Sequence, residues 1–124
     1  MDRVLIVGAG GCIGAMARYL ITLGMAKAFG EGFPYGTLAV NVIGGILIGF
    51  ILEGSKSVFP ISTEMRLFLT TGILGGLTTF STFSYETINM FNNKMFFAAS
   101  INAALNLFLS LTAVIIGQHF VKML

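Results

Sequence analysis

Hydrophobic positions dominate three long stretches of the chain, and none of these stretches contains an Asp, Glu, Lys or Arg. The uncharged runs have 21, 19 and 27 residues and lie between Glu31 and Glu53, between Arg66 and Glu86, and between Lys94 and Lys122. A helix of roughly 20 predominantly apolar residues is long enough to cross a bilayer. Each run therefore predicts one transmembrane helix.

A fourth apolar segment, RVLIVGAGGCIGAMARYL, begins near the N-terminus and contains Arg18 in its C-terminal half. The connections between the segments are short and contain turn-forming residues, among them Pro34 and Pro60. We predict an all-α membrane protein with a single domain over residues 1–124. Its four transmembrane helices are expected at 4–28, 34–53, 64–91 and 95–120.

Composition and charge support a membrane protein over other classes. Of the residues, 56% are hydrophobic and 10% are charged, whereas soluble domains have about 25% charged residues. The net charge of +2 is too small to indicate a nucleic-acid partner. Glycines four residues apart predict close helix packing in the membrane, at Gly10 and Gly14 and at Gly45 and Gly49.

The charges at the helix ends are nearly balanced between the two sides of the predicted bundle. Four basic residues lie on the side that holds both termini, and two lie on the other side, at Lys27 and Lys94. Because orientation follows such differences, a small bias is consistent with insertion in both directions and with two opposed copies pairing about a two-fold axis. Weak control of one orientation is the alternative.

Arg18 is the one ionisable residue expected deep in the first helix. A charge at the bilayer centre costs about 2.5–3.5 kcal/mol on insertion scales, so an intramembrane arginine is a candidate functional residue. In a water-filled vestibule its positive charge would attract anions. The alternative is that the side chain extends to the nearer lipid headgroups.

The third predicted helix contains features that interrupt helices. Gly72, Gly75 and Gly76 lower its helix propensity, and Thr78 carries a hydroxyl that competes for backbone groups. We predict a break from Gly75 to Thr78, where free carbonyl groups can hold a cation, as in discontinuous transporter helices. The alternative is a continuous helix whose glycines only allow close packing.

Phenylalanine and asparagine side chains predict a polar path next to this break. Phe80 and Phe83 share one helix face, and the electropositive edges of their rings can stabilise an anion. Asn102, Asn106 and Ser110 recur every four residues along the last helix. A second-helix amide, Asn41, adds to this set. Phenylalanines that only pack, and amides that only bond between helices, are the alternatives.

The run TTGILGGLTTFSTFSYE closely resembles the signature of the CrcB/Fluc family of small fluoride channels. The segments GGCIGAMARY and GTLAVNVIGGILIGF are similar to that family's first and second helices. The resemblance covers nearly the whole chain in order. It implies an antiparallel, dual-topology homodimer in a prokaryotic cell membrane, with two fluoride pores and a structural sodium ion at the dimer centre.

The resemblance also implies roles for individual residues. Gly75 and Thr78 match the residues whose backbone carbonyls hold the sodium ion. Arg18 matches the vestibule arginine, and Glu86 matches the acidic residue that closes the motif. The remaining matches fall on the fluoride pathway: Asn41, Phe80, Ser81, Thr82, Phe83, Asn102, Asn106 and Ser110.

The main rival function is that of a small four-helix, proton-coupled multidrug exporter. Such a transporter needs an acidic residue deep in the membrane, whereas the deep ionisable residue here is Arg18 and Glu86 lies toward a helix end. An enzyme is not expected, because the only histidine, His119, lacks metal-ligand spacing and no nucleophile lies beside a base in a recognisable pattern.

Overall fold

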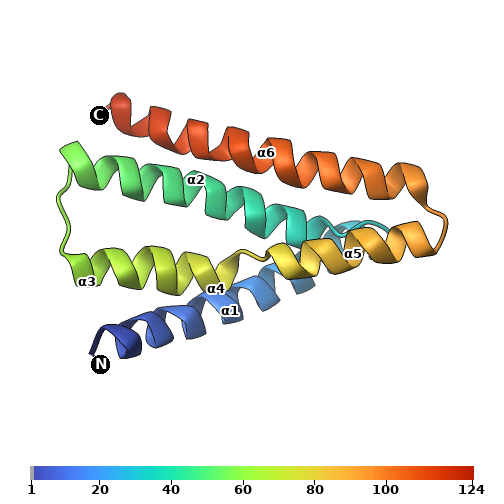
Figure 1. Ribbon diagram of the computed structural model, residues 1–124, viewed down its shortest axis with the longest axis horizontal. Helices are drawn as coiled ribbons and strands as arrows, with labels where there is room; N and C mark the ends of the chain where they lie inside the picture. Colours follow the sequence, from blue (N-terminus) through green and yellow to red (C-terminus); the bar gives the residue numbers. More distant parts are fainter. Residues whose placement is uncertain (1) are drawn as a thin grey trace.

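The computed structural model describes residues 2–124 and consists of long helices joined by short loops. Four of its helical stretches are long and apolar enough to cross a membrane, as predicted. Consecutive stretches run in opposite directions, so the N- and C-termini lie at the same end of the bundle (Figure 1). They are α1 (Asp2–Phe29), α2 (Tyr35–Ser57), the third span (Thr63–Asn92) and α6 (Phe96–Lys122).

The third span consists of four segments: α3 (Thr63–Arg66), η1 (Leu67–Leu74), α4 (Gly75–Leu77) and α5 (Phe80–Asn92). Between α4 and α5, Thr78 and Thr79 have extended backbone conformations, with ψ angles of 157° and 119°. Gly75, which we expected to begin an unwound stretch, remains helical. The extended stretch therefore begins at the last residue of the predicted range, Thr78, and continues one residue beyond it, to Thr79.

Local signals explain where the other helices begin and end. Gly30, with a φ of +80°, follows α1 and donates its N–H to the Ala26 carbonyl at 2.8 Å, a common way to end a helix. Pro34 directly precedes α2. The Ser62 hydroxyl accepts the N–H of Met65 at 3.1 Å and caps the start of α3.

The η1 segment is a π-helix, a wider form that the sequence did not predict. Its last turn includes an N–H from Gly75 to the carbonyl of Thr70, five residues earlier. π-helical turns often occur near functional sites in helices. Here one short α-helical turn, α4, separates the π-helix from the extended residues, so the third span departs from α-helical geometry on both sides of α4.

Two glycine pairs bring backbones together, as predicted. A Cβ atom on Gly14 of α1 would overlap the Ile73 carbonyl group, and one on Gly10 would lie 2.9 Å from Gly72. A Cβ atom on Gly45 of α2 would lie 2.9 Å from the backbone carbonyl oxygen of Ser110, and Gly49 similarly faces the Val114 backbone. Small residues thus place α1 against the third span and α2 against α6.

The bundle has a small apolar core and a large apolar surface. Val40, Leu74 and Leu77 form the buried cluster. Large apolar side chains are exposed on α1, α2, α5 and α6, including Phe80 at 79% and Phe97 at 82%. Exposed apolar surface of this extent suits contact with lipid or with another protein surface.

Candidate functional site

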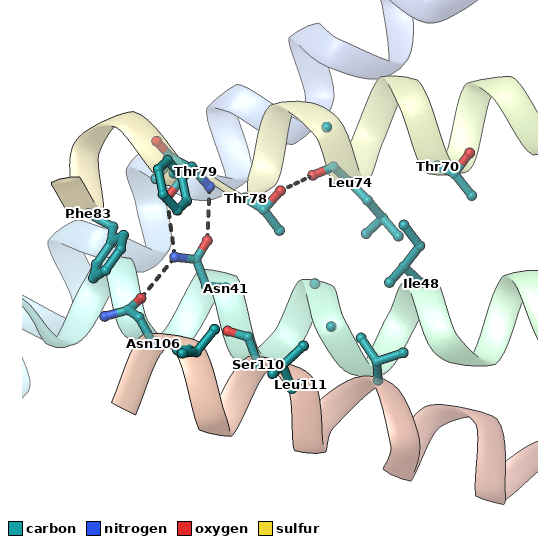
Figure 2. Close-up of a pocket in the computed structure, with 16 residues that line it drawn as sticks. Asn41, Ile48, Thr70, Leu74, Thr78, Thr79, Phe83, Asn106, Ser110 and Leu111 are labelled. Atoms are coloured by element: carbon teal, nitrogen blue, oxygen red, sulfur yellow. Dashed lines mark hydrogen bonds between the residues drawn. The ribbon is translucent and has the colours of Figure 1, made fainter. Parts of the chain in front are cut away.

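A cavity of about 450 Å³ lies between α2, the third span and α6 (Figure 2). None of its 16 lining residues is charged. The polar lining consists of amides, hydroxyls and backbone groups, and the remainder is aliphatic or aromatic. The residues predicted from sequence that line it are Asn41, Gly75, Thr78, Phe80, Phe83, Asn106 and Ser110.

Asn41 binds the backbone that the third span leaves free at its extended residues. Its side-chain oxygen accepts the N–H of Thr79 at 2.9 Å, and its side-chain nitrogen donates to the Thr79 carbonyl at 3.2 Å. Freed backbone groups inside a membrane must find protein partners, because lipid offers none. One side chain of α2 therefore supplies partners for both backbone groups of Thr79 (Figure 2).

From Asn41, hydrogen bonds continue along α6 and return to α5. The nitrogen of Asn41 also donates to the Asn106 side-chain oxygen at 2.9 Å. Asn106 donates to the side-chain and backbone oxygens of Asn102, both at 3.0 Å. Asn102 in turn donates to the Thr87 hydroxyl at 2.9 Å. Asn102 and Asn106 are 0% and 5% exposed, so this stripe is buried between helices.

Phe80 and Phe83 both line the cavity, and their rings lie edge to face. Their centroids are 5.5 Å apart and their planes meet at 68°. Phe83 is partly buried beside Asn106, whereas Phe80 is largely exposed. Such an arrangement presents an electropositive ring edge as well as a ring face.

Ser110 lies one helical turn from Asn106 and contributes a hydroxyl that lacks a partner. Its oxygen is buried and forms no hydrogen bond with the rest of residues 2–124. Since a buried hydroxyl without a partner is costly, this oxygen is available for a water molecule or a ligand in the cavity.

Ser81 and Thr82 lie at the start of α5 and outside the cavity lining. The Thr79 hydroxyl caps this helix by accepting the Thr82 N–H at 3.2 Å, and it also donates to the Thr82 hydroxyl at 3.1 Å. The Ser81 hydroxyl lies 3.4 Å from the same oxygen. Both hydroxyls thus belong to the cap that restarts the helix after the extended residues.

Gly75 and Thr78 are among the residues that line the cavity. No donor within the described part of the chain reaches either carbonyl oxygen. These are among the last carbonyls of a helix, which have no partner within the helix itself. Neutral carbonyl oxygens suit a hard cation such as sodium, so the donor set fits the ion that the resemblance implies.

Arg18 and Glu86 do not reach this cavity. Arg18 lies on α1, is partly buried, and forms no side-chain hydrogen bond or ion pair among residues 2–124. Glu86 lines a second cavity, of about 370 Å³, next to the loop between α1 and α2. One of its carboxyl oxygens is buried without a partner there.

Comparison with known proteins supports the family resemblance. Residues 5–118 match the family described as "CrcB-like protein, Camphor Resistance (CrcB)". The chain belongs to the CrcB family. It is similar to proteins named "Fluoride-specific ion channel FluC", with 57% identity to one from Clostridium perfringens that covers 97% of this chain and 94% of the relative. Another from Geobacter sulfurreducens is 50% identical and covers 82% of both chains.

Two elements of the site in this CrcB protein were not predicted from the sequence. The first is the pairing of Asn41 with the Thr79 backbone, which depends on the register of α2 against the third span. The second is Thr87. The one signal for Thr87 was its position four residues after Phe83, on the same face of α5.

Replacing Asn41 with leucine is predicted to destabilise the fold. The substitution leaves the Thr79 N–H and carbonyl without partners, and each unsatisfied buried group costs about 1–3 kcal/mol. Asn89→Leu is the matched control, because Asn89 is exposed and its side chain forms no hydrogen bond within residues 2–124. Thermal unfolding in detergent can be monitored by size-exclusion chromatography of heated samples. The midpoint temperature of unfolding should be lower only for Asn41→Leu. Equal midpoints for the two variants would contradict the assignment.

Proposed function

We propose that this CrcB protein is a fluoride-selective ion channel of the cell membrane. The observation that carries the proposal is an uncharged cavity lined by amides, hydroxyls and two phenylalanines, between helices long and apolar enough to cross a membrane, in a chain 57% identical to proteins named fluoride-specific ion channels. Because those relatives are channels by name, we place this chain among channels and not among enzymes.

The proposed pathway replaces the water around fluoride with protein donors. Fluoride is small and strongly hydrated, so donors must approach it closely. Amide N–H groups, hydroxyls and ring edges can do so without a fixed positive charge that would trap the ion, and conduction requires weak binding. The proposed pathway residues are Asn41, Phe80, Ser81, Thr82, Phe83, Asn102, Asn106 and Ser110.

Two charged residues are assigned to the approaches to this pathway. Arg18 is proposed to raise the local concentration of anions in a vestibule, and its lack of a carboxylate partner within the described chain leaves its positive charge unneutralised. Glu86 is proposed to lie near one mouth, where its unpaired buried oxygen would accept a donor.

An antiparallel homodimer with two pores and a discontinuous third helix completes the proposal. The nearly balanced positive charge at the two ends of the bundle supports dual topology. The exposed Phe80 ring and the free carbonyls of Gly75 and Thr78 support a second copy on this face. A sodium ion bound by these carbonyls would add positive charge beside the anion path, in surroundings that screen it less than water does.

Flux through such a channel is passive, and we propose that it exports fluoride. Fluoride enters from acidic surroundings as the neutral acid, dissociates inside, and then leaves down its gradient. The rival exporter needs an acidic residue in its transport site, but no carboxylate lines the cavity beside Asn41.

Purified protein in liposomes is predicted to release fluoride but not chloride. Vesicles loaded with both ions are diluted into a buffer free of either, and ion-selective electrodes follow each ion. Fluoride efflux well above that of protein-free vesicles, without matching chloride efflux, supports the proposed function. Equal release of both ions, or release of neither, would refute it.

A matched pair of phenylalanine variants serves as the control for this experiment. Phe83→Ile should slow fluoride efflux by up to about tenfold, because aromatic edge contacts contribute about 0.5–1.5 kcal/mol. Phe97→Ile should leave the rate unchanged, since Phe97 is 82% exposed on the bundle surface and lies outside the cavity. Slower fluoride efflux through Phe97→Ile than through Phe83→Ile would place the pathway elsewhere.

Removal of sodium is predicted to lower both fluoride flux and dimer content. The protein is purified with a large organic cation in place of sodium, because such a cation cannot fit between backbone carbonyls. The measurements are fluoride efflux and molecular mass by light scattering, each repeated after sodium is restored. A dimer of unchanged mass and flux in the sodium-free preparation would count against the proposed cation site.

A further inference from the structure

Four hydrogen bonds link Thr79 to Thr87 in one donor-to-acceptor direction. Each amide oxygen accepts from the preceding group, and each amide nitrogen donates to the next one. The successive donor–acceptor distances are 2.9, 2.9, 3.0 and 2.9 Å. The chain of bonds passes from the Thr79 N–H through Asn41, Asn106 and Asn102 to the Thr87 hydroxyl.

Thr87 can only accept at the far end of this chain. Its hydroxyl has one proton, and it donates this proton to the carbonyl of Phe83, one turn earlier in α5, at 2.8 Å. Only lone pairs of the hydroxyl oxygen therefore face Asn102. Thr87 is 8% exposed, so water does not readily compete for this position.

The two ends of the chain determine which way the three amides face. An asparagine side chain can place either its oxygen or its nitrogen on a given side, and its hydrogen-bond partners decide which. The backbone N–H of Thr79 can only donate, so it requires the oxygen of Asn41. The Thr87 oxygen, its proton already committed, requires the nitrogen of Asn102. Both ends favour the same direction, and hydrogen bonds in a chain strengthen one another.

We infer that Thr87 is a positioning residue for anion conduction. It holds the Asn102 amide with its nitrogen directed toward α5 and thereby holds the Asn106 amide with its nitrogen directed toward Asn102. The inference rests on the proposed function. Both N–H groups of Asn41 and both of Asn106 are occupied by protein oxygens. Asn102 is 0% exposed and lies outside the cavity lining, so it acts on the pathway through Asn106, which lines the cavity. A reversed Asn102 would turn its nitrogen toward the Asn106 nitrogen, and the two donors would displace the Asn106 amide from its position in the cavity wall.

Three single substitutions separate this role from packing. Thr87→Val keeps the shape of the side chain and removes the hydroxyl, whereas Thr87→Ser keeps the hydroxyl and removes the methyl group. Ser100→Ala is the control, because the Ser100 hydroxyl also donates to a carbonyl four residues earlier but bonds to no other helix. We expect Thr87→Val to slow fluoride efflux by about fivefold to tenfold, the effect of losing one oriented hydrogen bond. Thr87→Ser and Ser100→Ala should remain within about twofold of the unsubstituted protein.

A double substitution tests whether Thr87 acts through Asn102. If it does, Thr87→Val should cause little further slowing in a chain that already carries Asn102→Ala, because the amide that Thr87 orients is gone. Slowing by the same factor in both backgrounds would overturn the inference. If Asn102→Ala does not yield folded protein, the single substitutions decide. Slower fluoride efflux through Thr87→Val than through Thr87→Ser supports the role. Equal efflux rates, or slower efflux through Thr87→Ser, would overturn it.

Failure of this inference is distinguishable from failure of the proposed function. If the unsubstituted chain releases no fluoride from liposomes, the channel assignment itself is wrong, and the positioning role fails with it. If the unsubstituted chain conducts fluoride and Thr87→Val conducts equally fast, the channel assignment stands and only the role of Thr87 is refuted.

Discussion

The hydrogen bonds between Asn41 and the Thr79 backbone are the interaction on which the site depends. A transmembrane helix satisfies its own backbone groups, and an interruption removes that advantage where no water can replace it. At Thr79 one N–H and one carbonyl lack partners within the helix, and the Asn41 amide of α2 forms a hydrogen bond with each of them. This requirement sets the position of α2 along the third span. It also places the free edge of the Asn41 amide opposite α6, where Asn106 continues the network.

The same interruption explains why hydrogen-bonding groups are concentrated in an otherwise apolar bundle. Extended backbone at Thr78 and Thr79 leaves the carbonyls at the end of α4 without helical partners and turns the Thr79 hydroxyl into a cap for α5. Amides, hydroxyls and ring edges therefore meet around one cavity without any charged side chain. Such surroundings can stabilise a small anion and still release it, whereas a fixed positive charge would hold it.

Sequence patterns predicted the parts of this structure that depend on short segments. Uncharged runs predicted the four long helices, glycine spacing predicted the close approaches at Gly14 and Gly49, and a spacing of four residues placed Asn102 and Asn106 on one face of α6. Pairings between helices were not predictable, because they depend on register. The bond between Asn102 and Thr87 is one example. The π-helix of η1 was missed because no residue type in that run distinguishes it from an α-helix.

Selectivity for fluoride over chloride is the central claim, because closely spaced neutral donors can replace the hydration of the smaller ion but not that of the larger one. The most direct measurement is the zero-current voltage across a planar bilayer that contains the purified protein, with fluoride at unequal concentrations on the two sides and chloride added to one side. We predict that this voltage follows the fluoride gradient and does not change when chloride alone is diluted. A voltage that shifts with the chloride concentration would contradict the account.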